Sequence, residues 1–238
     1  MSASNSIGTL REQSLHAALK QWLAMPGDLF EQKMGSYHID ILRGDTLIEI
    51  QTSSFYKLRK KLTILLEEHK VLLIHPIPVT KWVIRTTKRK KQISRRKSPK
   101  RGRIEHIFDE LLYIPDIATH PNFSLAVLLT EQEEIWRDDG KGSWRRKHWS
   151  VADKVLLNVV DQTIFCGKND YLALVPSQIE QPFTNRQLAE ALNAPIWVSN
   201  RMSYCLRKIG ALNVIGKQGN ALLLAAAKPA DKIERNEQ

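Results

Sequence analysis

Two carboxylates in a short, isoleucine-rich segment are the residues of this chain best placed to do chemistry. Residues 38–52 read HIDILRGDTLIEIQT, and Asp40 and Glu49 flank a central Gly-Asp pair that is typical of a two-residue hairpin turn. Residues at equal distances from that turn pair across the hairpin, which sets Asp40 opposite Glu49. Because side chains alternate across a strand, His38 and Gln51 share their face, and the four isoleucines share the other face.

This pairing of acids predicts a cation site. Carboxylates directly opposite each other on neighbouring strands repel, since their Cβ atoms are roughly 4.5–5.5 Å apart. A hard divalent cation removes the repulsion, and Mg²⁺ (or Mn²⁺) prefers carboxylate oxygens and waters as ligands. A cation held there can activate a water and neutralise the charge that develops on a phosphate. Glu12, three residues before Leu15 of the preceding helix, either reaches this site or is an exposed first-turn acid.

The net charge indicates a polyanionic partner. The 238 residues include 36 Lys and Arg against 25 Asp and Glu, which gives +11. Such a surplus favours nucleic acid, because neutralising phosphates releases counterions. Residues 85–103 hold eleven basic side chains and no acid, and they are either a solvated loop or a basic arm that becomes ordered on phosphate. No basic amphipathic helix or lipidation signal indicates a membrane partner.

The two cysteines and the N-terminal residues predict a cytoplasmic protein. Cys166 and Cys205 lie far apart and form no CxxC motif, so neither a disulfide framework nor a zinc site follows. The first residues lack the layout of a signal peptide, and no apolar run approaches ~18 residues.

Helices and buried strands alternate through the first half of the chain. A helix is expected over 7–23, with Leu15, Leu19, Trp22 and Leu23 as its apolar stripe, and a second one over 55–69. The remaining expected elements are strands at 71–77, 81–85 and 124–129 and a helix at 104–113. This alternation predicts an α/β fold, with a mixed sheet flanked by helices over 1–130.

The second half has a different composition. Residues 131–149, with their glycines, charges and tryptophans, predict a linker or exposed hairpin. Ser150 is expected to cap a helix that carries Val151, Val155, Leu156 and Val159. Thr184 and Gln187 have capping-box spacing, a further helix runs from Pro195 to Gly210, and two apolar strands surround GKQG. This order is that of a winged-helix (α+β) domain over 150–228, followed by a disordered tail at 229–238. The unit either binds DNA or mediates dimerisation and protein contacts.

The hairpin and its neighbours resemble the PD-(D/E)XK nuclease superfamily, which includes restriction endonucleases and Holliday-junction resolvases. The resemblance covers about 9–85 and consists of a helix with Glu12, the pattern D-(x8)-E-x-Q on a hairpin, and a following helix. It implies a restriction-endonuclease-like sheet in which Asp40, Glu49 and the backbone carbonyl of Ile50 ligate Mg²⁺. Gln51 stands where the family has lysine. Lys57 or Lys60 of the next helix could replace that lysine, and Lys57 is preferred.

Together these features predict a metal-dependent DNA nuclease, a phosphodiester hydrolase acting in repair, recombination or defence. A homodimer is compatible with this activity, because cutting both strands of a duplex usually needs two sites. The alternatives are a non-catalytic DNA-binding regulator or accessory protein on a degenerate nuclease scaffold, and an RNA-processing nuclease. The expected catalytic residues are Glu12, Asp40, Glu49, Gln51 and Lys57. The side chains expected to contact DNA are Arg89, Lys90, Lys91, Arg95, Arg96, Lys97, Lys100 and Arg101 in the basic arm, and Asn200, Arg201, Tyr204, Arg207, Lys208 and Lys217 in the C-terminal unit.

Overall fold

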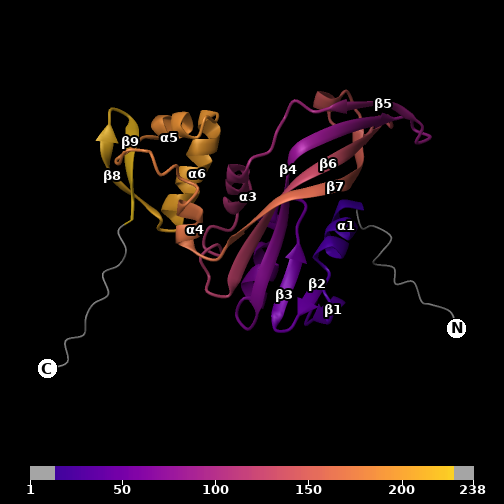
Figure 1. Ribbon diagram of the computed structural model, residues 1–238, viewed down its shortest axis with the longest axis horizontal. Coiled ribbons are helices and arrows are strands. Elements are labelled where there is room, and N and C mark those ends of the chain that lie inside the picture. The colour runs from indigo at the N-terminus through magenta and orange to yellow at the C-terminus, as the bar shows by residue number, and fades with distance from the viewer. Residues whose placement is uncertain (1–13, 228–238) are drawn as a thin grey trace.

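The computed structural model describes residues 14–227, which form an α/β fold around a mixed seven-stranded sheet (Figure 1). The strand order is β1-β2-β3-β4-β6-β7, and β5 pairs with β4 beside this path. The strands are β1 (Leu29–Met34), β2 (Tyr37–Arg43), β3 (Thr46–Ile50), β4 (Lys70–Thr86), β5 (Gln92–Lys97), β6 (Phe123–Arg137) and β7 (Ser150–Phe165). The pairs β3–β4 and β4–β6 are parallel, and the other neighbours are antiparallel.

The predicted hairpin register is confirmed, but the ladder between β2 and β3 is short. Ile41 pairs with Ile48 and Leu42 with Leu47, and Gly44 turns the chain with a φ of 56° that glycine adopts without strain. The ladder ends at the Ile41–Ile48 pair, so Asp40 lies just beyond it.

The isoleucines of the hairpin do not all share one face. Ile41, Ile48 and Ile50 belong to one buried cluster, whereas Ile39 belongs to the other, together with Leu47. Strict alternation fails because β2 leaves the ladder at Asp40, whose carboxylate accepts a hydrogen bond from the backbone N–H of Ile50. The Asp40 carboxylate therefore takes the place of a backbone carbonyl as the acceptor for the Ile50 N–H, at the point where β2 and β3 separate.

Helices cover both sides of the sheet. The helix α1 (Ser14–Leu23) buries Leu15 and Leu19 against the Ile41 and Ile48 cluster, whereas Trp22, expected in its apolar stripe, is 48% exposed. The second cluster is covered by short helical segments, namely η2 (Phe55–Leu58), α2 (Arg59–Leu65), η3 (Ile104–Ile107) and α3 (Phe108–Leu111).

Three long strands extend beyond this core. The strands expected at 71–77 and 81–85 are one strand, β4, with a bulge between Pro78 and Thr80. Only part of the predicted basic arm is a loop, because residues 92–97 form β5, which pairs with the outer half of β4. The expected linker contains the end of β6 and a short helical turn, η4 (Trp144–Arg146).

The helix predicted to begin at Ser150 is wrong, because residues 150–165 form β7, which pairs along β6. The main sheet thus continues across the domain boundary predicted between 130 and 150. After β7 come α4 (Lys168–Leu172), α5 (Asn185–Ala191), α6 (Ile196–Lys208) and the hairpin of β8 (Leu212–Gln218) and β9 (Ala221–Ala226). The capping box of Thr184 and Gln187 is confirmed, and so is the turn at Gly210, with a φ of 70°. The tail predicted at 229–238 lies outside the described residues.

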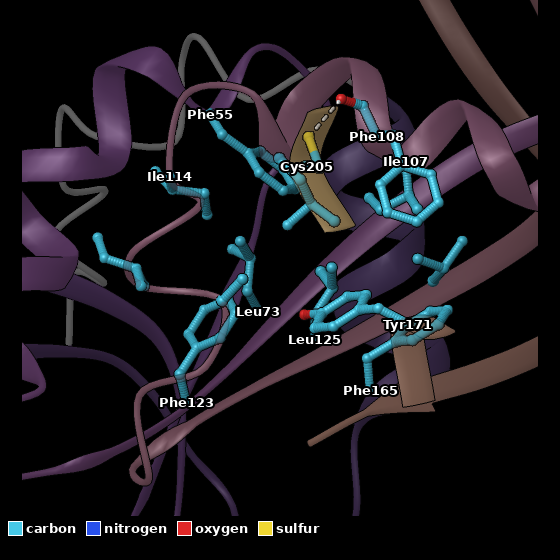
Figure 2. Close-up of a cluster of buried hydrophobic side chains, with 14 of the residues drawn as sticks. Phe55, Leu73, Ile107, Phe108, Ile114, Phe123, Leu125, Phe165, Tyr171 and Cys205 are labelled. Atoms are coloured by element: carbon cyan, nitrogen blue, oxygen red, sulfur yellow. Dashed lines mark hydrogen bonds between the residues drawn. The ribbon is translucent and has the colours of Figure 1, made fainter. Parts of the chain in front are cut away.

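The C-terminal elements share one hydrophobic core with the sheet (Figure 2). Met202 and Cys205 of α6 are fully buried in the cluster that contains Phe108 and Phe165. The Cys205 thiol lies 3.6 Å from the carbonyl oxygen of Phe108, and the rings of Phe165 and Tyr171 stack at 4.8 Å. The elements after Phe165 therefore pack as an extension of the first unit.

Candidate functional site

Asp40 is held where β2 separates from β3 by groups from two elements. Its Oδ2 lies 2.8 Å from the backbone nitrogen of Ile50 and 3.2 Å from Nε2 of His16, and its Oδ1 lies 3.9 Å from Nζ of Lys20. Both His16 and Lys20 come from α1. Burial alone would raise the pKa of Asp40, but hydrogen bonds from His16 and Ile50 and the charge of Lys20 lower it below its ordinary value. Asp40 is thus a stable carboxylate.

Glu49 is the more strongly perturbed acid. It is only 5% exposed, and its Oε1 lies 2.5 Å from Nζ of Lys61 on α2. The same ammonium donates to the carbonyl oxygen of His38 at 2.5 Å, so it bridges β2 and β3. Burial raises the pKa of the Glu49 carboxyl to about 7, and the charge of Asp40 acts in the same direction, against the lowering effect of Lys61.

The structure brings Asp40 and Glu49 together in a different way from the one the sequence predicts. Asp40 contacts α1 and Glu49 contacts α2, yet the charges of the two acids still influence each other. Lys61, His16 and Lys20 offset the repulsion between the two acids, so these side chains supply part of the positive charge that the sequence predicts from a bound cation. Among residues 14–227, no three His, Cys, Asp or Glu side chains are grouped so that they could hold a metal ion.

The lysine that reaches Glu49 is Lys61 and not Lys57. Lys57 is exposed on η2, four residues before Lys61. The side-chain amide of Gln51 donates to the carbonyl oxygen of Ser54 at 2.8 Å and to Oγ of Ser53 at 3.2 Å, so it faces the loop that follows β3. Glu12 lies outside the described residues. Helical spacing could have indicated Lys61, because it stands beside Leu62 and four residues before Leu65, both buried.

The residues expected to contact DNA fall into two surfaces. Those of the basic arm are all exposed, although Arg95 also pairs with Glu133 and lies over the ring of Trp82. On the C-terminal unit, Arg201 contacts Asp109 of α3 at 2.7 Å and stacks on Trp197, so it takes part in packing against the main unit. Arg207 is half-buried, and the remaining exposed candidates there are Asn200, Tyr204, Lys208 and Lys217.

Two comparisons with known proteins, a family model and one relative, cover the whole main sheet. A family model described as a domain of unknown function, DUF8091, matches residues 13–166. An uncharacterized protein of Treponema pallidum (strain Nichols) is 28% identical over 227 residues, which cover 95% of this chain and 90% of that relative. No solved structure matches the chain. Over residues 14–227, no helix combines the length and apolar composition needed to cross a bilayer.

The matched range runs from the residue before α1 to the residue after β7. It contains every strand of the main sheet together with His16, Lys20, Asp40, Glu49 and Lys61, and it ends before α4 begins. Because it covers well over half of the sequence, this chain belongs to the DUF8091 family.

Proposed function

We propose that the protein is a metal-dependent nuclease that hydrolyses phosphodiester bonds of DNA. The observation that carries the proposal is that Asp40 and the Glu49–Lys61 pair lie where β2 leaves β3, close enough for the charge of Asp40 to act on Glu49. Two carboxylates and a lysine that come together at the separating ends of two neighbouring strands are the groups that the PD-(D/E)XK resemblance requires. In this proposal Lys61 takes the place of the lysine that is absent at position 51.

The order of elements supports the same family likeness. A helix precedes a β-hairpin, and a second helix then connects β3 to the parallel strand β4. This is consistent with a restriction-endonuclease-like core. The elements α4, α5, α6, β8 and β9 follow in the order of a winged helix, which we propose as a second DNA-contacting unit through Asn200, Tyr204, Lys208 and Lys217.

The chemistry of the donor set fits Mg²⁺ or Mn²⁺. Asp40 and Glu49 offer hard carboxylate oxygens from neighbouring strands, and a divalent ion between them would favour the ionised form of Glu49, whose pKa burial raises to about 7. The backbone carbonyl of Ile50 would complete the protein ligands. When bound, such an ion supplies Lewis-acid stabilisation of the phosphate and an activated water.

The remaining side chains of the site would orient these groups. Lys61 fixes the Glu49 carboxylate through its contact at 2.5 Å and carries the positive charge that a negatively charged transition state needs. Hydrogen bonds from His16 and from the N–H of Ile50 hold the Asp40 carboxylate in one orientation and favour its ionised form. Gln51 is directed to Ser54, and its backbone carbonyl accepts from His75, so it holds the loop that follows β3.

One observation favours the alternative, a non-catalytic DNA-binding protein on the same scaffold. Both carboxylates already have cationic neighbours, Lys61 for Glu49 and Lys20 with His16 for Asp40. Calorimetric titration of Mn²⁺ into the wild type and into Asp40→Asn separates the two functions. Binding that the substitution removes supports the nuclease, whereas absence of binding in the wild type supports the scaffold.

Cleavage of linear duplex, single-stranded, branched and plasmid DNA, and of RNA, in Mg²⁺ or Mn²⁺ is the direct test. We expect Asp40→Asn, Glu49→Gln and Lys61→Ala each to lower the cleavage rate by about 100-fold or more, because each removes a charge at the reacting phosphate. DNA binding by these variants should persist.

Lys57→Ala is the matched control, since Lys57 precedes Lys61 by one helical turn and is exposed. It should retain wild-type cleavage. A wild-type protein that cleaves none of these substrates in either metal contradicts the proposal. The proposal also includes a cytoplasmic location and a homodimer. Cys166 and Cys205 are both free, which suits a reducing compartment.

A further inference from the structure

A groove with a volume of ≈ 680 Å³ lies on the outer part of the sheet, away from Asp40 and Glu49. Its floor is formed by Lys81 of β4 and by Glu134 and Trp136 of β6. One wall is the end of β5 and the segment after it, and the other wall is η4 with its flanking residues. Figure 1 shows the long strands β4, β6 and β7 arching toward this region, with β5 at their end.

The groove carries a strong positive charge. Its only acid among the described residues is Glu134, which is buried and already bonded to Lys81 at 2.6 Å and to the indole N–H of Trp136 at 2.8 Å. The other charged groups that line it are all cations, and none has an acidic partner within residues 14–227: Arg96, Lys100, Arg145 and Arg146. Four uncompensated cations around one concave surface are suited to phosphate groups.

An aromatic platform stands at the rim of the same groove. Trp144 of η4 is 75% exposed, the largest exposure among the large hydrophobic side chains described. The guanidinium of Arg145 lies 5.5 Å from its ring, which places a cation beside the indole. An exposed indole next to a row of phosphate-binding cations is the arrangement that binds unpaired bases, because each base offers a π-face for stacking.

We infer that this groove binds a single-stranded segment of nucleic acid, with a base stacked on Trp144 and the backbone phosphates on the four cations. A duplex conceals the faces of its bases, so it could use the cations and not the indole. The inference rests on the proposed function and names the form of substrate that the site would receive. It also supplies a more exposed aromatic platform than α6 offers, where Trp197 and Tyr204 are 41% and 40% exposed.

A second hollow continues from the groove toward the acids. It has a volume of ≈ 290 Å³, shares Lys81 and Lys100 with the groove, and extends to His75 and Glu110. The Nδ1 atom of His75 lies 2.7 Å from the carbonyl oxygen of Gln51, two residues after Glu49. A strand that leaves the groove along this hollow would therefore run toward the loop that follows β3.

The test measures binding in EDTA by fluorescence anisotropy, with labelled single-stranded and duplex DNA of about 12 nucleotides or base pairs. We expect Trp144→Ala to weaken single-strand binding by about 5- to 100-fold, the loss of one stacked base, and to change duplex binding little. Arg96→Ala should reduce the salt dependence of single-strand binding by about one phosphate contact. Far-UV circular dichroism verifies that each variant is folded.

Trp22→Ala is the matched control, because Trp22 is exposed on α1 and does not line the groove. It should bind like the wild type. Unchanged single-strand affinity in Trp144→Ala, or an equal loss for duplex, overturns the inference. Since no metal is present, the result is independent of cleavage: single-strand binding that requires Trp144 supports the groove even in a protein that proves unable to cleave DNA.

Discussion

Above the raised pKa of Glu49, about 7, Glu49 and Lys61 form an ion pair in which both groups have lost most of their water. Their side chains are only 7% and 15% exposed, and the pair is anchored by the second contact of Lys61 to the carbonyl oxygen of His38. Removing one member of such a pair typically costs about 3–5 kcal/mol, because the remaining charge stays buried and unpaired. Glu49 and Lys61 therefore matter for folding as well as for the proposed chemistry.

Glu49 should make the stability of the metal-free protein depend on pH. Burial raises its pKa from 4.5 to about 7, so between these values the folded state holds a proton that the unfolded state has released. Its contribution is then fully present below pH 4.5 and is lost as pH rises toward 7. Relative to Glu49→Gln, the wild type should lose roughly 3 kcal/mol of unfolding free energy between pH 4.5 and pH 8.

Urea denaturation of both proteins across this range, in EDTA, measures the difference. Glu49→Gln is a suitable reference because its amide keeps the size and hydrogen-bonding capacity of the carboxyl group without its titration. A difference in unfolding free energy that stays constant with pH would show that Glu49 titrates with an ordinary pKa.

At the scale of single elements, a close backbone contact and two residues with positive φ angles fix the loop between β6 and β7, which carries Trp144. The backbone of Gly142 approaches Trp149 so closely that a Cβ there would lie 1.7 Å from the carbonyl oxygen of Trp149. Lys147 and His148 have φ angles of 50° and 64°, the left-handed region that costs residues with a side chain roughly 1–3 kcal/mol each. Hydrogen bonds from Gly142 N to His148 O and from His148 N to Ser143 O hold this conformation.

Gly142→Ala should therefore displace η4 while leaving the core folded. We expect single-strand binding to fall at least as far as in Trp144→Ala, with far-UV circular dichroism close to that of the wild type. Gly167→Ala is the control, because a Cβ at that position meets nothing within 4 Å and its φ of −169° is open to any residue. If Gly142→Ala binds single strands as the wild type does, the loop does not govern the groove.

At the scale of the whole molecule, α6 and the sheet should unfold together. Met202 is fully buried in the cluster that also contains Phe108 and Phe165. Met202→Ala should lower the unfolding free energy by about 2–5 kcal/mol and shift a single thermal transition, because one core extends from the sheet to the C-terminal elements.

Lys208→Ala, an exposed change on the same helix, should leave the transition where it is in the wild type. Circular dichroism and tryptophan fluorescence should report the same midpoint for Met202→Ala. Two separate transitions, of which only one moves, would instead indicate a C-terminal domain that unfolds by itself.

The parts of the fold that could be predicted from sequence depend on short-range patterns. The hairpin register follows from its turn, and the capping box at Thr184 follows from two side chains three residues apart. The departure of β2 at Asp40 could not be predicted in this way, because it depends on a hydrogen bond to Ile50 that replaces a ladder contact. Strict alternation of side chains therefore predicts Asp40 and Glu49 on one face of the hairpin, whereas in the structure Asp40 contacts α1 and Glu49 contacts α2.

The error at Ser150 has a different physical origin. Val151, Val155, Leu156 and Val159 have a spacing that fits a helix, and they are only partly buried in β7. Their strand conformation is imposed by pairing with β6, a partner whose presence no local pattern reveals. The sequence predicts Lys57 or Lys60 at the site, whereas the lysine that contacts Glu49 is Lys61, because the direction of a side chain from a short helix depends on how that helix packs on the sheet.

The strand β4 extends from the two acids to the groove, so it sets the distance between these two sites. Ile74 pairs with Ile50 beside the acids, and Lys81 on the floor of the groove follows seven positions later on the same strand. At about 3.3 Å per residue this separation is at most about 23 Å, since the bulge between Pro78 and Thr80 shortens it, and a sheet of hydrogen-bonded strands keeps it nearly fixed. In the proposed nuclease, a single strand with a base stacked at Trp144 would therefore be cut at a nearly constant number of nucleotides from that base, whatever its sequence.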